Sequence, residues 1–500
     1  MRRGSLILLM SLSVTTLLYG QETDFADLKS KMTSKSLPLV NLTYDETKLN
    51  TATFIEGKIE IVDLQRRTEG KTNVSYHAKF RIRGASAGGL NKKSFAVKLL
   101  DENSKDLDAD IFGIRPENSW ILDGMGFDRI RMRNRVCFDL WNEMSCTPYP
   151  TKYENRNGTK GVFVEVFVNE NYHGLYCMTD KIDRKLLGLK KYENNTVRGL
   201  LYKGINYNSS YRLKTYDKNA DTDKKEWDAW ELQYPEDYPS IDTWKPLMDL
   251  IDFCSNNTSK DKYNQHYNDY FYTSTFEDYW VMMAALNVGD NLYKNTFLSV
   301  VDITEGHRYM ITPWDMDMSL GGKSDGTNNE SLVDLVKYSN RAPYDRLYFQ
   351  NIDGFMDRVK EKWRILQNTV FSVEHVHKIL DDYGTLFVQS GAWEREYAKW
   401  KQDHKTVLQN DLSKELDYVK DWYIKNYDYV CQLWGRQIKG DVNGDNYVKA
   451  DDVKELKEII MKKKTDYKMS SADVNADGLV NAADIVEVIK IIRRNKALYK

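Results

Sequence analysis

The chain has 500 residues, 41% of them hydrophobic, and its 72 Lys and Arg residues nearly balance 74 Asp and Glu residues. A chain of this size and composition fits a soluble globular protein of roughly two to four domains. The net charge of -2 leaves no basic surplus, so the sequence lacks the charge pattern of proteins that bind nucleic acid or an anionic membrane.

The first residues have the pattern of an export signal. Arg2 and Arg3 precede an apolar stretch from Leu6 to Leu18, which matches the hydrophobic region of a signal peptide and is too short to span a bilayer. We therefore expect residues 1–20 to be a signal peptide and the mature chain to be secreted. No later stretch of about 18 apolar residues occurs in the sequence, so we expect no membrane span.

The cysteines are too sparse for a disulfide framework. The chain has 5 of them, an odd number and a small one for an exported protein of this size. The alternatives are one bridge, from Cys137 to Cys146, or buried free thiols.

A sheet-rich segment with many basic residues follows. Apolar and basic side chains alternate in Lys79–Arg83 and again in Lys92–Leu99, which predicts two strands. The glycine-rich turn Gly84–Gly89 separates them. Backbone N–H groups of such a turn can approach phosphates, and a nearby basic side chain can neutralise them. The segment therefore predicts an anion pocket, with the candidate binding residues Arg83, Lys93 and Lys98.

The order of the elements predicts a mixed fold. Apolar residues at helical spacing predict a helix over 137–144, and the run Gly161–Val168 followed by Tyr172–Tyr176 predicts a hairpin. From Asp242 onward helical patterns dominate, interrupted by one short β segment. We therefore expect an α+β fold over residues 37–435, with a smaller sheet-rich lobe followed by a larger helical one.

The short β segment carries the candidate catalytic residues. A predicted helix over 276–286 is followed by a polar loop, a hairpin and then Asp315 and Asp317. In protein kinases a loop Asp accepts the hydroxyl proton, an Asn five residues later holds Mg²⁺, and an Asp after a hairpin links the metal to ATP. Asp290 and Asn295 have this spacing. The sequence thus predicts Asp290 as the general base, and Asn295, Asp315 and Asp317 as ligands of Mg²⁺ or Mn²⁺.

These stretches together resemble the spore-coat CotH kinase family, an atypical, secreted branch of the protein-kinase-like fold. The resemblance spans about Phe54 to Gly322 and rests on Arg81–Gly84, Lys92–Phe95, Arg131–Asn134, Glu165–Asn169, Tyr172–Tyr176, Leu201–Gly204 and Pro313–Asp317. It implies a two-lobed domain, ATP-dependent phosphorylation of a protein substrate, and a metal-chelating role for Asp315. The family's local sequence differs around residue 290, and the glutamate that pairs with the ATP lysine is open between Glu143 and Glu165.

A twelve-residue pattern occurs twice near the end of the chain. Residues 441–452 and 473–484 place oxygen-bearing side chains at positions 1, 3, 5 and 12, and a helical pattern follows each loop. Such loops suit Ca²⁺, which takes about six to eight oxygen ligands. The predicted ligands are Asp441, Asn443, Asp445 and Asp452 in the first loop, and Asp473, Asn475, Asp477, Asn481 and Asp484 in the second.

The paired loops resemble a type I dockerin module, which seats enzymes on cohesin domains of cellulosome-type assemblies. The resemblance covers Gly440 to about Arg494, and we assign residues 436–500 to this small all-α domain. It implies Ca²⁺, a cohesin-bearing scaffold protein as partner, and a part in polysaccharide degradation. Asn446 and Lys449 replace the turn glycine and an oxygen donor in the first loop, which puts the calcium affinity of that loop in question but not its fold.

Two other functions stay open on the sequence alone. The same fold without chemistry would be a docked binding or scaffold component. Alternatively, Asp315 and Asp317 would be the carboxylate pair of a polysaccharide-acting hydrolase. ATP binding that requires a divalent metal would separate a kinase from both.

Overall fold

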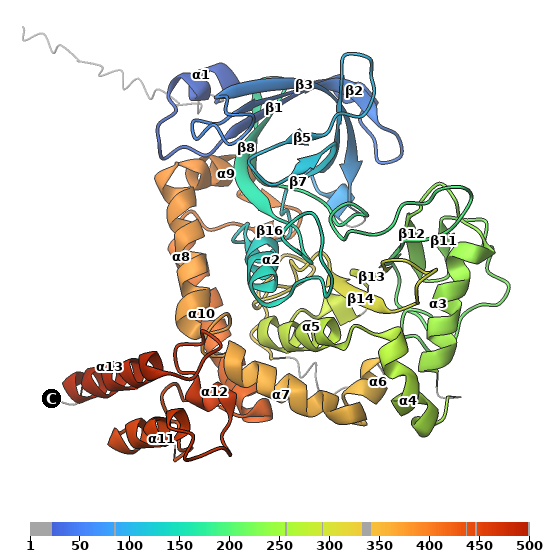
Figure 1. Cartoon of the computed structure of the whole chain (residues 1–500). Coiled ribbons are helices and arrows are strands. Elements are labelled where there is room, and N and C mark those ends of the chain that lie inside the picture. The colour runs from blue at the N-terminus through green and yellow to red at the C-terminus, as the bar shows by residue number, and fades with distance from the viewer. Residues whose placement is uncertain are drawn as a thin grey trace, which may run out of the picture.

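The structure, a computed structural model of the chain, describes residues 23–84, 87–255, 258–292, 294–332, 342–436, 438–445 and 448–498. The expected signal peptide, residues 1–20, lies outside these ranges. Figure 1 shows a β-rich N-terminal part, a helical part that contains a second sheet, and a small helical unit at the C-terminal end.

In the described N-terminal residues, seven strands form a closed barrel in the order β1-β2-β3-β4-β7-β9-β8. Neighbouring strands are antiparallel except for β1 and β8, whose parallel pairing closes the ring. Alternate side chains point inward and form a core that includes Phe80, Val97 and Trp120. The strands are β1 (Leu39–Tyr44), β2 (Ile55–Val62), β3 (Asn73–Arg83), β4 (Ser94–Leu100), β7 (Ser119–Asp123), β8 (Gly161–Val168) and β9 (Asn171–Thr179).

Short elements decorate the barrel and connect it to the helical part. The helix α1 (Phe25–Ser30) packs its buried Phe25 against Phe167 of β8. The other short elements are η1 (Glu46–Lys48), η2 (Ala87–Gly89), β5 (Ala109–Asp110) and β6 (Pro116–Glu117).

The second sheet is antiparallel and has the order β11-β12-β10-β13-β14. Its strands are β10 (Leu200–Gly204), β11 (Glu226–Trp227), β12 (Trp230–Tyr234), β13 (Thr296–Val300) and β14 (Tyr309–Pro313). The β13–β14 hairpin confirms the β segment predicted within the helical half. Its register pairs Thr296 with Pro313, which brings the loop before β13 next to the residues after β14.

Helix α5 (Thr273–Leu286) is the centre of the helical part. Its residues from Thr275 to Leu286 are all buried, as expected for a helix surrounded by other elements. It packs against β14, α7 and α10, and its buried Glu277 pairs with Arg358 of α7 at 2.7 Å. The surrounding elements are α2 (Arg133–Met144), α3 (Ile241–Cys254), α4 (Lys260–Tyr270), η3 (Asp290–Leu292), α6 (Tyr344–Leu347), η4 (Ile352–Gly354), α7 (Phe355–Leu366), α8 (Val373–Gln389), α9 (Ala392–Trp400), β15 (Gln402–Asp403), β16 (Thr406–Val407) and α10 (Leu412–Trp434).

The mixed composition predicted from the sequence is confirmed at this level. Strands dominate residues 39–179, and helices dominate from Ile241 onward. The predicted hairpin is β8–β9, and the helix predicted over 137–144 lies within α2.

All five cysteines are free, with Cys146 exposed and the other four buried, so the alternative bridge from Cys137 to Cys146 does not form. Among the described helices, none has the length and apolar character needed to cross a membrane.

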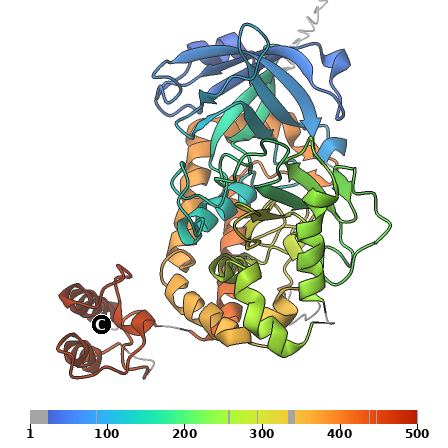
Figure 2. The ribbon, with the colours of Figure 1, turned by 45° about the vertical axis from the view of Figure 1, so that its right-hand side comes forward.

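The C-terminal unit consists of α11 (Ala450–Ile460), α12 (Met469–Ala472) and α13 (Ala482–Leu498). It has its own small core, in which Leu456, Ile459 and Val488 are buried. Figure 2 shows the unit standing beside the helical part, joined to it by a narrow connection. The contacts between them include that of α12 with α7.

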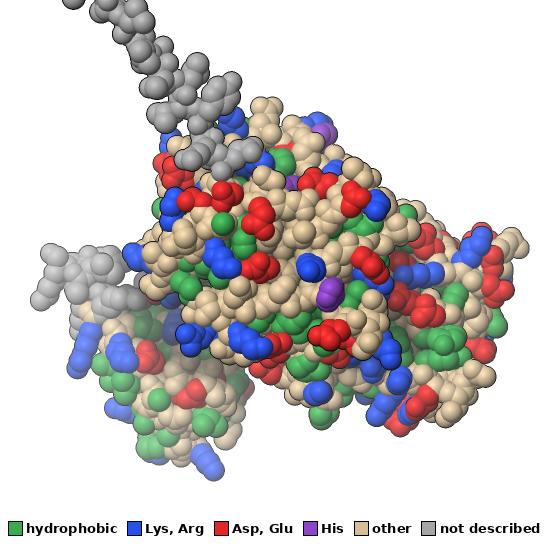
Figure 3. All heavy atoms as spheres, turned by 90° about the horizontal axis from the view of Figure 1, so that it is seen from above, with side chains coloured by type: hydrophobic (Ala, Val, Ile, Leu, Met, Phe, Trp, Pro, Cys, Tyr) green, Lys and Arg blue, Asp and Glu red, His purple; other side chains and the backbone are tan. Residues whose placement is uncertain are grey.

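The surface over the barrel carries mixed charges. Figure 3, which looks onto this end of the molecule, shows acidic and basic side chains interspersed rather than gathered into one field. This arrangement agrees with the near-neutral net charge of the sequence.

Barrel closure depends on the absence of a side chain at Gly57 of β2. A Cβ atom there would lie 2.2 Å from the carbonyl oxygen of Thr43 and 2.9 Å from the ring of Phe80. We expect Gly57→Ala to lower the free energy of unfolding by about 1–3 kcal/mol, because overpacking displaces the β1 backbone. Gly89→Ala is the matched control, since nothing lies within 4 Å of its added carbon. Thermal unfolding compares the two, and equal melting temperatures would contradict this account.

Candidate active site

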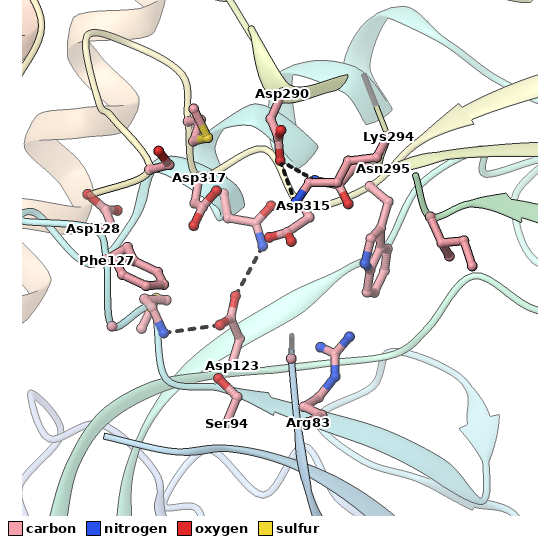
Figure 4. Close-up of a pocket in the computed structure, with 18 of the residues that line it drawn as sticks. Arg83, Ser94, Asp123, Phe127, Asp128, Asp290, Lys294, Asn295, Asp315 and Asp317 are labelled. Carbon is pink, nitrogen blue, oxygen red and sulfur yellow. Dashed lines mark hydrogen bonds and ion pairs between the residues drawn. The ribbon is translucent and has the colours of Figure 1, made fainter. Parts of the chain in front are cut away.

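A cavity of about 410 Å³ lies where the barrel meets the second sheet. The barrel contributes the end of β3, the start of β4 and the end of β7 with the residues after it, and the second sheet contributes the end of β10. Asn134 of α2 and the loops after α5 and β14 also line the cavity. Figure 4 shows Asp290, Asn295, Asp315 and Asp317 on one side of the cavity and Arg83 on the barrel side. The cavity therefore joins segments that are far apart in the sequence.

Two cations on the cavity wall form no ion pair with the described residues. Within the described residues, the side chains of Arg83 and Lys203 make no hydrogen bond or ion pair, although the Arg83 guanidinium lies 5.3 Å from the centre of the Trp314 ring. Burial lowers the pKa of both groups, and the nearby Arg83 charge lowers the pKa of Lys203 further. A wall of this kind attracts an anion.

Two carboxylates of the cavity are also without hydrogen-bond donors among the described residues. Both line the cavity, where Asp315 is exposed and Asp317 is half-buried. The pKa of Asp315 is raised by burial and then by the Asp123 carboxylate. The pKa of Asp317 lies well above its usual range because of burial and repulsion by Asp315. A cation placed beside these groups would relieve that repulsion.

Asn134 of α2 fixes the carboxylates of opposite walls relative to each other. Its side-chain N–H donates to Asp123 Oδ2 at 3.0 Å, and its side-chain oxygen accepts from the backbone N–H of Met316 at 3.0 Å. Asp123 also accepts from the backbone N–H of Met125 at 3.0 Å. Asp315, whose φ of 54° is in the left-handed region, is thereby held in a turn that few residues adopt.

The loop before β13 is tied to the turn after β14. Asp290 accepts a hydrogen bond from the Asn295 side chain at 2.8 Å and lies 3.5 Å from the Lys294 ammonium group. Buried Asn291 donates to the backbone oxygens of Asn295 and Trp314, at 3.0 and 2.8 Å. Burial raises the pKa of Asp290, while Lys294 opposes this shift. The sequence-predicted Asp290, Asn295, Asp315 and Asp317, together with Arg83, therefore line one cavity.

The two lysines predicted to face an anion lie elsewhere. Lys93 Nζ donates to the backbone oxygen of Gly88 at 2.8 Å, and Lys98 Nζ lies 5.2 Å from the ring centre of Phe54; neither lines the cavity. For Lys98 the reason is strand alternation, since Val97 and Leu99 point into the barrel and Lys98 therefore points out of it. Lys203 lies on the cavity wall, where Lys93 and Lys98 do not.

The candidate glutamates for pairing with that lysine are also outside the cavity. Glu143 contacts His375 at 2.7 Å, and Glu165 forms a two-point ion pair with Arg395 at 2.7 Å. Sequence reasoning also missed Asp123 and Asn134. Lys203 could have been found from its position in the apolar strand Leu200–Gly204, because lysine is rare in buried strands.

The residues present fit a hard divalent cation that keeps several waters. Asp315, Asp317 and Asn295 offer carboxylate and amide oxygens, which Mg²⁺ prefers, and the repulsion between the two carboxylates favours a cation. Among the described residues no three Asp, Glu, His or Cys side chains converge as a complete metal site. Mg²⁺ suits such an incomplete set, because it usually takes one or two carboxylates together with phosphate oxygens and water.

The C-terminal loops fold around their own acidic side chains. In the first loop, buried Asp452 accepts hydrogen bonds from the backbone N–H groups of Val442, Asn443 and Lys449. In the second loop, Asp484 accepts from Asn475 and Asn481 in the same way. The last Asp of each loop thus draws the start and end of that loop together.

The Asp residues at the first position of each loop also accept backbone hydrogen bonds from their own loop. Asp473 accepts from the backbone N–H groups of Asp477 at 3.1 Å and Gly478 at 2.8 Å, and Gly478 has a φ of 85° where the chain turns. Asp441 accepts from Gly444 and Asp445, at 2.9 and 3.0 Å. Asn446, the predicted departure from the turn glycine, lies outside the described residues. The donor set of Asp and Asn oxygens fits Ca²⁺.

Comparison with known families agrees with this geometry. Residues 80–430 match the family model described as CotH kinase protein. The chain belongs to the CotH family. Residues 439–493 match a second model, described as Dockerin type I domain. No curated protein matches the chain.

The dockerin match gives the C-terminal unit a binding role. Dockerin domains bind Ca²⁺, and their partners are cohesins. Dockerin-bearing proteins are typically extracellular. The chain therefore combines a CotH domain with a calcium-dependent docking module.

Calcium removal should destabilise the dockerin module. At about 100 times the Kd, bound Ca²⁺ stabilises a fold by about 2.7 kcal/mol, so a chelator should lower the melting temperature of this unit.

Asp452→Asn should weaken calcium binding to the first loop by at least about tenfold, since it removes a ligand charge. Asp451→Asn, at the exposed neighbouring position, is the control. Calorimetric calcium titration of the full chain would contradict this account if both variants bound alike.

Proposed function

We propose that the CotH domain is a protein kinase that binds ATP with Mg²⁺ or Mn²⁺ in the cavity and phosphorylates a protein substrate. In this proposal the barrel is the smaller lobe of an atypical kinase-like fold, and the helical part with the second sheet is the larger lobe. The dockerin attaches the enzyme to a cohesin-bearing scaffold of a secreted, cellulosome-type complex for polysaccharide degradation.

One observation supports the proposal above the others: the cavity presents charges of both signs that make no hydrogen bond or ion pair with the described residues. Arg83 and Lys203 would attract an anion, whereas Asp315 and Asp317 would attract a cation. A metal–nucleotide complex satisfies both demands at once, because the metal neutralises the carboxylates and the phosphates neutralise the basic groups.

Each cavity residue has a role in this proposal. Arg83 and Lys203 bind phosphate oxygens, and the Arg83 guanidinium can do so with two hydrogen bonds in one plane. Asp315, Asp317 and Asn295 would hold the divalent ion, which when bound supplies charge neutralisation of the phosphates. Asn134 and Asn291 keep these groups in place through the backbone of Met316 and the oxygen of Trp314.

Asp290 is the proposed general base. Its hydrogen bond from Asn295 fixes the carboxylate at the rim of the metal-binding residues, where an incoming hydroxyl group could donate its proton. Burial raises the pKa of Asp290, which makes the carboxylate a better proton acceptor than an ordinary Asp. Lys294, 3.5 Å away, opposes this rise of the Asp290 pKa.

A polysaccharide hydrolase fits the cavity less well. A neutral glycan would leave Arg83 and Lys203 uncompensated in a partly buried wall. A docked binding component without catalysis would show no metal-dependent ATP binding or, if the nucleotide site is retained, no phosphoryl transfer, so binding and transfer are both measured.

ATP binding should depend on the carboxylate at position 315. We expect Asp315→Asn to abolish Mg²⁺-dependent ATP binding measured by calorimetry, because the metal loses its principal charged ligand. Lys203→Met should weaken binding by about 10- to 100-fold, the value of a charge-assisted hydrogen bond to phosphate. Lys98→Met is the matched control and should leave the Kd unchanged, since Lys98 lies on the outer face of the barrel. Absent or metal-independent ATP binding by the unaltered chain would refute the proposal.

Phosphoryl transfer should depend on Asp290 in a different way. Asp290→Asn should lower kcat by about 10²–10⁴-fold while leaving the Kd for ATP within about twofold, because a general base acts only in the transfer step. Transfer of labelled γ-phosphate to casein as a probe acceptor measures the rate. The surface variant Asp237→Asn controls for loss of one negative charge. No transfer by the unaltered chain, despite tight ATP binding, would favour the non-catalytic alternative.

A further inference from the structure

A fully buried cluster of charges joins α9 to the barrel. Glu396 of α9 has no solvent exposure, and its Oε1 accepts hydrogen bonds from Lys92 Nζ at 2.5 Å and Arg131 Nε at 2.8 Å. Its Oε2 accepts from the backbone N–H of Leu175 in β9 at 2.8 Å. Figure 1 shows α9 against the barrel beside β8. One carboxylate thus bonds the strand β9, the residues before β4 and the residues before α2.

Arg131 extends this cluster to the wall of the cavity. Its Nη1 donates to the backbone oxygens of Met125 at 2.6 Å, Gly126 at 2.8 Å and Asp128 at 3.0 Å. Together with Phe127, these residues line the cavity, and Figure 4 shows Phe127 and Asp128 near Asp317. The bend is not one that the backbone adopts unaided, since Met125 and Arg131 have φ values of 51° and 57°. Arg131 therefore helps to hold the backbone of this wall, together with the hydrogen bonds that the Asp128 carboxylate accepts from the backbone N–H groups of Met132 and Arg133 at 2.7 Å.

The charges of the cluster make Glu396 its centre. Burial alone would raise the pKa of Glu396, but Lys92 and Arg131 outweigh it and the pKa is lowered, so the carboxylate is ionised. Burial lowers the pKa of Lys92 to about 7, and Glu396 opposes that shift. Buried ion clusters contribute little stability compared with apolar packing, but they are sensitive to geometry. We therefore expect this cluster to fix the orientation of α9 relative to the barrel and to the wall Met125–Asp128, and not only to hold α9 on the barrel.

We propose that Glu396 is a positioning residue of the cavity: through Arg131 it holds the wall Met125–Asp128, so that the docking of α9 on the barrel sets the shape of the nucleotide site. This inference rests on the proposed function only where it concerns nucleotide affinity. The part that concerns the conformation of the wall is independent of any ligand.

The same helix provides a matched control. Arg395, the neighbour of Glu396, pairs with Glu165 of β8 through two contacts of 2.7 Å, and Glu165 is 1% exposed on its side chain. This pair also docks α9 on the barrel, but it makes no contact with the wall Met125–Asp128. Glu165→Gln and Glu396→Gln therefore change the same functional group at the same interface, and only the second is connected to the cavity.

The first measurement is amide hydrogen exchange of the full chain, read by mass spectrometry on the peptide that contains Met125–Asp128. Exchange there should accelerate by at least about tenfold in Glu396→Gln and stay within about twofold in Glu165→Gln. Equal acceleration in both variants, or none in Glu396→Gln, would overturn the inference and leave α9 with a docking role only.

The second measurement is the Kd for ATP with Mg²⁺. Glu396→Gln should weaken binding by about tenfold at unchanged stoichiometry, and Glu165→Gln should not, because a displaced wall misplaces groups that contact the nucleotide. If the unaltered chain binds no ATP, the proposed function fails, whereas the exchange experiment still decides the positioning role. If Glu396→Gln does not fold, Arg131→Lys keeps the charge but cannot reach three carbonyl oxygens, and the same increase in exchange is expected.

Discussion

The separation of opposite charges across one cavity is the constraint on which the rest of the CotH domain depends. Arg83 and Asp315 would attract strongly at low dielectric and would pair if their backbones allowed it. They are kept apart because Arg83 ends a barrel strand, whereas Asp315 lies in a turn fixed by Asn134. Lys203 is held in the same way by the second sheet. The barrel and the second sheet thus keep the charges available for a ligand that carries both signs.

The sequence predicted the local elements of this fold better than its closure. The hairpin β8–β9 and the helix α5 follow from periodicity within a short window, so they could be read from residues alone. The barrel is closed by β1 pairing in parallel with β8, two strands far apart in the chain. Nothing in either strand specifies that partner, because pairing of distant strands depends on how the whole ring packs.

The same distinction explains which site residues could be predicted. Asp290, Asn295 and Asp315 lie close in sequence around one hairpin, so their spacing carried information. Lys203 comes from a different sheet and reaches the cavity only through the pairing of β10 with β13. Lys98 was chosen for its proximity to a glycine-rich turn, a criterion that ignores which face of the strand it occupies. The calcium loops were the most predictable site, since each is one continuous segment of twelve residues.

The two sites also differ in how far their geometry depends on the rest of the molecule. Each calcium loop is organised by its own last Asp, and the module has a core separate from that of the CotH domain. The cavity, by contrast, depends on Glu396 through several buried contacts. The dockerin meets the CotH domain at α7, on the side away from the barrel (Figure 1). The elements that make this contact, α12 and α7, contribute no residue to the lining of the cavity, so the docking module and the proposed kinase site use separate parts of the described chain.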